Sequence, residues 1–199
     1  MDLPIYELRL TGDDKTRVEA VALVDMPAIG LNYQAFNSNT KYDFKIADSE
    51  QRVVMGAAMI PDLPIYRRDE RGEYYAIFRK DTINEIVKKF FKEQRNSEFN
   101  EMHDKALKTN GVFIYQSWIT DSKMGVQAPK GFENVADGSW FIAAKVEDED
   151  LWAKIKEQGV YKGFSVEGVF DVIPSKSPEE EAADEFIKIV KNYFDKNAR

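Results

Sequence analysis

The sequence predicts an α+β domain with mostly antiparallel strands and a C-terminal helical appendage. Short β-branched and aromatic runs recur along the chain between turn-forming residues, whereas helical apolar periodicity is confined to a few segments. The chain has 199 residues, of which 43% are apolar. This size and composition suit one globular domain with a sizeable core plus an appendage.

The expected strands are apolar or alternating runs bounded by Gly, Pro, Asn or Asp. They cover residues 5–10, 18–24, 52–60, 73–78, 112–119, 139–146 and 161–173. Residues 11–14 predict a turn that lets the first two strands pair. We expect polar loops at 37–42 and 120–138, and an irregular segment over 96–111.

The first expected helix covers residues 82–94, where Thr82 and Glu85 fit a capping box. A second helix is expected over 148–158, with acidic residues at its start and Gly159 as its stop. These helices and the strands constitute the first predicted domain, residues 1–173.

Residues 174–199 are predicted to form a linker and an amphipathic helix that begins with Ser177 as N-cap and Pro178 at the first position. The apolar stripe of this helix comprises Ala183, Phe186, Ile187, Val190, Tyr193 and Phe194. The stripe is expected to be buried on the domain, on a second copy of the chain in a homo-oligomer, or on another partner.

Composition excludes several function classes. The 28 basic and 35 acidic residues give a net charge of −7 without clustered Lys or Arg, which argues against sequence-independent nucleic-acid binding. With no cysteine and one histidine, thiolate sites and two-His metal sites are ruled out. No apolar run reaches the ~20 residues of a membrane span, and no signal peptide is recognisable, so we expect a protein of a reducing cytoplasm.

Familiar catalytic motifs are missing: there is no Walker loop, no G-x-G-x-x-G and no H-E-x-x-H. Gly163-Phe164-Ser165 begins like a nucleophile elbow, but Glu167 occupies the position of its second glycine. The following residues also continue a strand, whereas an elbow leads into a helix. An α/β-hydrolase is therefore disfavoured.

Ser165 and His103 remain as candidates for chemistry. A serine hydroxyl needs an adjacent base to act as a nucleophile, and neutral imidazole is the usual one. Gly163 and Gly168 are expected to leave space for a substrate backbone and for N–H groups that face an oxyanion. Taken alone, the residues favour a small strand serine and a solvated loop histidine without catalytic roles.

The chain resembles the XkdF-type serine proteases of tailed phages, relatives of the prohead (capsid maturation) proteases and of herpesvirus assemblin. The resemblance rests on segments 21–29, 56–67, 116–119 and 138–140 together with Met102-His103-Asp104 and Gly163-Phe164-Ser165-Val166-Glu167-Gly168. It implies a small twisted β-barrel flanked by helices. It also implies that His103 is the general base and Ser165 the nucleophile.

The third catalytic member stays open. Residues 165, 167, 169 and 171 share one face of a strand, so Glu167 is the first candidate to orient His103 and Asp171 a second. Asp104 is adjacent to His103 and cannot easily fold back onto its ring. The family often has Glu where this chain has Gln116. If that carboxylate orients the histidine, this protein would be slower or compensated elsewhere.

The resemblance implies a capsid-maturation serine endopeptidase without metal or organic cofactor. It would cleave scaffold, itself and the N-terminal part of the major capsid protein inside the procapsid, in the host cytoplasm. The alternative is a non-enzymatic scaffold or core protein on the same fold. Arg67 and Arg68 are expected on a loop rim, where a substrate-carboxylate role has no support from sequence alone.

Overall fold

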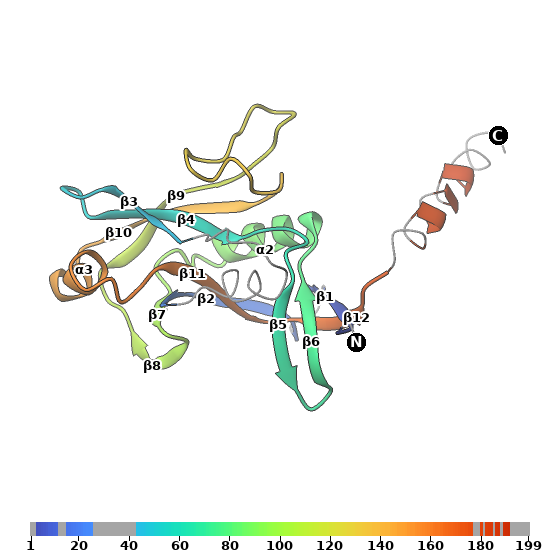
Figure 1. Ribbon diagram of the computed structural model, residues 1–199, viewed down its shortest axis with the longest axis horizontal. Coiled ribbons are helices and arrows are strands. Elements are labelled where there is room, and N and C mark those ends of the chain that lie inside the picture. Colours follow the sequence, from blue (N-terminus) through green and yellow to red (C-terminus); the bar gives the residue numbers. More distant parts are fainter. Residues whose placement is uncertain are drawn as a thin grey trace.

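The computed structural model describes residues 3–11, 15–25, 43–176, 180, 182–184, 186–187 and 189–191. The described strands form three four-stranded sheets (Figure 1). None of these sheets closes on itself, so the α+β class is supported but the expected barrel is not confirmed. Among the described strand pairs, β1–β6 and β2–β7 are parallel and the others antiparallel.

Each sheet combines strands that are distant in the sequence. Sheet A has the order β12 (Asp171–Pro174), β1 (Ile5–Arg9), β6 (Gly72–Ile77), β5 (Ile65–Asp69). Sheet B has the order β11 (Gly163–Val169), β2 (Arg17–Val24), β7 (Phe99–Glu101), β8 (Asp104–Lys108). Sheet C has the order β3 (Lys45–Asp48), β4 (Val53–Met59), β10 (Trp140–Val146), β9 (Val112–Ile119).

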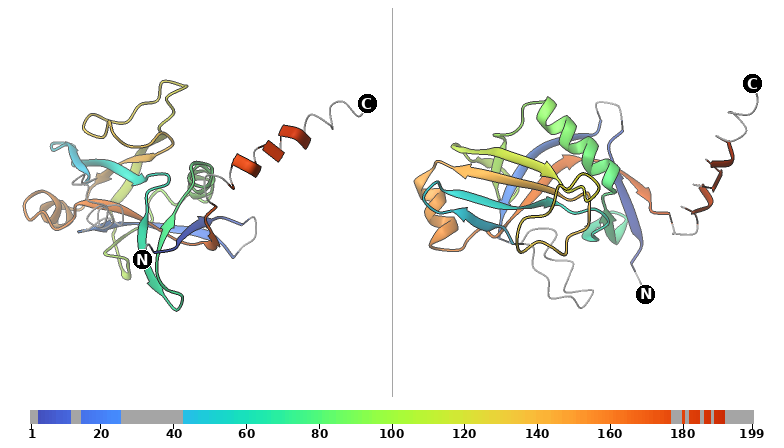
Figure 2. Two further views of the ribbon diagram at one scale, coloured as in Figure 1. Left: turned by 45° about the vertical axis from the view of Figure 1, so that its right-hand side comes forward. Right: turned by 90° about the horizontal axis from the view of Figure 1, so that it is seen from above.

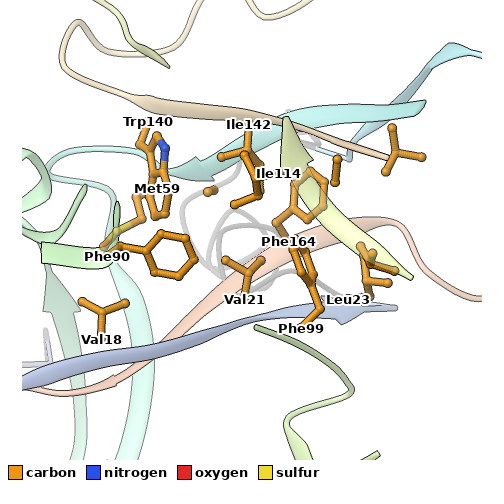
Figure 3. Packing of buried hydrophobic residues seen from close by; sticks show 14 of the residues in the cluster. Val18, Val21, Leu23, Met59, Phe90, Phe99, Ile114, Trp140, Ile142 and Phe164 are labelled. Carbon is orange, nitrogen blue, oxygen red and sulfur yellow. The ribbon is translucent and has the colours of Figure 1, made fainter. Parts of the chain in front are cut away.

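One hydrophobic core joins the three sheets and two helices, α2 (Lys80–Lys92) and α3 (Glu149–Lys156). In Figure 3, Leu23 and Phe164 of sheet B face Ile142 of sheet C, and Phe90 of α2 lies beside Trp140. The largest of these side chains are almost completely removed from solvent. Because apolar burial is the main stabilising contribution, this shared core fixes how the sheets are placed relative to one another.

Several sequence-based expectations are wrong. β1 and β2 do not pair, because β1 lies between β12 and β6 in sheet A whereas β2 belongs to sheet B. Helix α2 begins at Lys80 and its N-cap Arg79 makes no side-chain capping bond, so Thr82 and Glu85 form no capping box. The segment 96–111 is not irregular, since it contains β7 and β8.

The second helix begins as expected, with the Asp148 carboxylate accepting a hydrogen bond from the Leu151 N–H at 2.8 Å. The last predicted strand is divided into β11 and β12, which belong to different sheets. Strands β3 and β5 were not expected. The predicted loop at 37–42 and the Ser177-Pro178 cap lie outside the described residues.

The described C-terminal helical residues project away from the sheets (Figures 1 and 2). Phe186 is 67% exposed, and Ile187 and Ile189 are also exposed. These side chains therefore do not complete the domain core. No helix within the described ranges is long and apolar enough to cross a membrane.

Candidate active site

The candidate site lies on the face of sheet B that is turned away from the core. Side chains alternate along a strand, so Phe164 enters the core whereas Ser165 and Glu167 occupy the opposite face of β11. Strand register then sets Ser165 opposite Ala22 on β2, and Ala22 beside Asn100 on β7. One row of residues across the sheet thus runs from Ser165 to Asn100.

His103 reaches this face from a tight turn. Glu101 pairs with Asp104, so Met102 and His103 are the two central residues of the β7–β8 hairpin. Their φ angles are +53° and +62°, which is the left-handed region that two-residue hairpin loops require and that Asn-Gly pairs usually supply. Non-glycine residues pay a conformational cost there, and such strain concentrates at functional sites.

The hairpin is fixed to the neighbouring strand. The Met102 N–H donates to the Leu23 carbonyl at 2.9 Å, which continues the β2–β7 pairing into the turn. The Asp25 N–H donates to the Met102 thioether sulfur at 3.4 Å. These contacts hold the turn at the end of β2, so the His103 backbone has a defined position despite its exposed location.

The His103 ring folds back over sheet B and meets Glu167. Nδ1 of His103 lies 2.9 Å from Oε1 of Glu167, which also accepts a hydrogen bond from Nδ2 of Asn100 at 2.8 Å. A carboxylate can only accept, so Nδ1 carries the hydrogen in this contact. In neutral imidazole, Nε2 is then left as the acceptor, which is the tautomer that a general base needs.

Two small residues of β2 make this contact geometrically feasible. Ala20 lies opposite Glu167 and Ala22 opposite Ser165, on the strand that separates β11 from β7. The turn that carries His103 lies on one side of the row formed by Ser165, Ala22 and Asn100, and Glu167 lies on the other side. The His103 ring therefore crosses this row to reach Glu167. A larger side chain at either alanine would occupy the space between them.

Ser165 itself is buried, with 6% of its surface exposed. Within the described residues its hydroxyl makes no hydrogen bond, to His103 or to any other group. Catalytic hydrogen bonds are often long without substrate and tighten in the substrate complex. The structure therefore provides an oriented base and a nearby serine on the same face, without a preformed bond between them.

The other carboxylates considered for orienting His103 are elsewhere. Asp171 lies in sheet A opposite Arg9, so the division between β11 and β12 removes it from this face. Asp104 accepts a hydrogen bond from the Ala106 N–H at 2.8 Å. Of the three candidates, only Glu167 contacts the imidazole in the described structure.

A family model described as "Putative phage serine protease XkdF" matches residues 42–174. The chain belongs to this family. The matched range contains His103, Ser165 and Glu167, whereas β1 and β2 precede it. No curated protein and no solved structure matches the chain.

Gly168 does not have the role expected of it in this XkdF-family chain. A Cβ atom at this position would lie 2.4 Å from the Arg17 carbonyl oxygen and 2.7 Å from the Phe170 ring. The glycine permits a close backbone approach where the β11–β2 register shifts after Glu167. The expectation that it leaves space for substrate is therefore wrong.

Gln116, where the family resemblance led us to expect Glu, lies away from the site. It is exposed on β9 of sheet C, opposite Ala143. In the described part of the chain it has no contact with the imidazole, whose carboxylate partner is Glu167. Replacement of a carboxylate at position 116 therefore leaves the His103–Glu167 pair intact.

Asn100 is a site residue that sequence reasoning missed. It is 3% exposed, donates to Glu167, and its Oδ1 is buried without a partner among the described residues. A buried polar group without a hydrogen-bond partner lowers the stability of the fold, so its presence indicates a role other than stability. The available signal was an asparagine three residues before His103, which is informative only when β7 is recognised as a strand.

The charged groups nearest to Glu167 are paired with other residues. Lys105 donates to Glu19 at 2.7 Å, and this ammonium holds the pKa of Glu19 below its usual value, with a smaller contribution from Arg17 and an opposing one from burial. Glu19 thus engages both Lys105 and Arg17. The Glu167 carboxylate accordingly contacts Asn100 and His103 rather than a lysine or arginine. No cluster of three or more potential metal ligands occurs in the described ranges.

Proposed function

We propose that the protein is a serine endopeptidase of phage capsid maturation, with Ser165 as nucleophile, His103 as general base and Glu167 as the group that orients His103. The observation that carries the proposal is the hydrogen bond between His103 Nδ1 and Glu167 on the face that contains Ser165. Membership in a family described as phage serine proteases supports the same reaction class.

The proposed reaction follows from these positions. Ser165 Oγ attacks the peptide carbonyl while His103 Nε2 takes its proton, and Glu167 stabilises the imidazolium that forms. The proton then passes to the leaving amine, and water releases the acyl group by the reverse sequence of transfers. Backbone N–H groups near Ser165 would stabilise the oxyanion. Asn100 holds the Glu167 carboxylate in place through its amide.

The proposed substrates are the scaffold, the protease itself and the major capsid protein, inside a procapsid in the host cytoplasm. The supporting observation for a phage context is the family description. We further propose that the C-terminal helix attaches the protease to scaffold or to a second copy. The exposed side chains of Phe186, Ile187 and Ile189 support such a contact, because apolar side chains clustered on a surface favour association.

A non-enzymatic scaffold or core protein on the same fold is the second candidate. It is favoured by one observation: within the described residues, the Ser165 hydroxyl and His103 are not hydrogen bonded. An assembly protein would retain the sheet and its His103–Glu167 pair without needing that contact.

A fluorophosphonate probe distinguishes the two candidates, because it labels only an activated serine. We expect labelling of the full chain that is lost in Ser165→Ala and retained in Ser122→Ala, a variant of an exposed loop serine. Mass spectrometry of co-expressed capsid proteins should show processing that depends on Ser165. An unlabelled, folded wild-type chain that leaves capsid proteins intact would favour the assembly role.

A further inference from the structure

A second feature beside Ser165 is an apolar pocket with one cationic group. The residues that line it include Met59, Ile65, Phe78 and Val166, and among the described lining residues Ser165 and Arg67 are the polar ones. The pocket lies between β11 and β5, which are edge strands of sheets B and A among the described strands. The pocket therefore lies next to Ser165, the candidate nucleophile, and is completed by residues of sheet A.

Arg67 is oriented towards this pocket by its position on β5. Ile65 and Arg67 share one face of the strand and both line the pocket, whereas Arg68 occupies the opposite face. The Arg67 side chain is exposed to solvent, but the protein around its guanidinium is close enough for burial to lower the pKa of Arg67. The group nevertheless stays charged, because arginine is not deprotonated in proteins.

Arg67 also lacks an acidic partner in the described structure. Among the described residues, the only side-chain hydrogen bond of Arg67 is from Nη1 to the Tyr66 carbonyl at 3.1 Å. By contrast, the nearby Arg71 and Arg79 form ion pairs with Asp69 and Asp62. A guanidinium that is partly desolvated without a counter-charge is unfavourable by itself and gains most from a carboxylate, which it can bind through two parallel hydrogen bonds.

The position of the pocket identifies which part of a substrate would enter it. In peptide hydrolysis, the attacked carbonyl must lie within bonding reach of Ser165 Oγ. The side chains on either side of that carbonyl are consequently the ones that can enter a pocket lined by Ser165 itself. The pocket would therefore bind the side chain of a substrate residue directly next to the scissile bond.

We propose that this pocket binds an acidic side chain directly beside the scissile bond, so that the protease cleaves next to Glu or Asp with Arg67 as the specificity-determining residue. The proposal rests on the proposed function and extends it to a substrate class. The apolar walls would contact the methylene groups of the side chain, and Arg67 would neutralise its carboxylate.

Other side chains fit less well for physical reasons. Lysine or arginine would place two positive charges in a partly desolvated space. A purely apolar side chain would fill the walls but displace water from Arg67 without replacing its hydrogen bonds. The difference between Glu and Gln in the same position isolates the contribution of charge.

The test is cleavage of a diverse peptide library by the full chain, with the cleaved bonds identified by mass spectrometry and Ser165 labelling measured in parallel. The variants are Arg67→Gln and Arg67→Glu, and Arg68→Gln serves as the matched control on the opposite face of β5. For the wild type and the control, we expect cleavage beside Glu or Asp to exceed cleavage beside Gln by at least about tenfold, as for other desolvated charge pairs.

Arg67→Gln should lose this preference while Ser165 can still be labelled, and Arg67→Glu should shift the preference to Lys or Arg. Cleavage by the wild type without acidic preference, or a preference unchanged in Arg67→Gln, would overturn the inference and leave the protease proposal standing. Absence of both Ser165 labelling and cleavage in the folded wild type would overturn the proposed function, and the inference with it.

Discussion

His103 and Glu167 are hydrogen bonded at 2.9 Å although their strands do not pair with each other. β2 lies between them and contributes only Ala20 and Ala22 to the intervening surface. The geometry of the candidate site thus depends on three strands: β11 supplies the serine and carboxylate, β7 supplies the asparagine and the turn, and β2 sets their separation.

His103→Asn should abolish cleavage while the protein remains folded. Asparagine tolerates the left-handed backbone at this position better than alanine, so the variant removes the base with little added strain. Without a base the rate should fall by at least about 10³-fold. Peptide cleavage and thermal melting measure the two effects separately.

The wild-type rate should also rise with pH, since only a neutral imidazole can accept the proton from serine. Single-turnover rates from pH 5 to 8 measure this dependence. A pH-independent rate with chemistry limiting, or full activity in His103→Asn, would exclude His103 as the base.

Glu167→Gln should keep the fold but lower the rate by roughly 10²- to 10⁴-fold, because an amide neither fixes the tautomer nor stabilises imidazolium. Asn100→Ala should cause a smaller loss, since Glu167 would retain its contact with His103. Rate constants for both variants at saturating substrate test this order. Equal activity of Glu167→Gln and wild type would show that the pair has no part in the reaction.

The sequence indicated much of the fold because its longer strands and its helices have clear periodicity. β4, β9, β10 and α3 fall close to their expected positions. The missed strands are short or exposed: β8 is exposed along its whole length, and β5 nearly so. Such strands carry no alternation pattern, because neither face is buried. Their existence depends on pairing with distant strands.

Prediction of the site was limited by the same cause. His103, Ser165 and Glu167 could be named from local motifs and the family resemblance. Asn100 and Arg67 could not be placed, because the first depends on β7 lying beside β2 and the second on β5 lying beside β11. Asp171 stayed a candidate only while 161–173 was treated as one continuous strand.

The β5–β6 hairpin should contribute acid-sensitive stability through Asp69. Hydrogen bonds from Arg71, with a further one from Tyr74, hold the pKa of this carboxyl well below its ordinary 3.8. A lowered folded-state pKa stabilises the folded state above the ordinary value, and the contribution declines as pH falls below it. Asp69→Asn should thus reduce the melting temperature more at pH 7 than at pH 3.

NMR titration of the Asp69 carboxyl measures the shift directly, and Glu70→Gln is a control in the same hairpin turn. Equal effects of Asp69→Asn at the two pH values would contradict the predicted linkage.

Truncation after Lys176 should leave a cooperatively folded protease that still cleaves short peptides. The described part of the C-terminal helix exposes the apolar side chains of Phe186, Ile187 and Ile189, and one of its contacts with the preceding segment is an exposed pair between Lys176 and Asp184. Exposed pairs contribute only about 0–1 kcal/mol. Calorimetry of the two forms tests this, and a broadened transition or aggregation of the shortened chain would assign the helix to the fold.

The pairing of β2 with β11 has a consequence for when the candidate site is assembled. β11, which carries Ser165, follows β2 in the chain by nearly the whole of the described domain. The base and the nucleophile therefore come together only after nearly the whole domain has been translated and its most distant strands have paired, which is a slow type of contact to form. An incomplete chain therefore lacks the assembled face on which Ser165, His103 and Glu167 lie together.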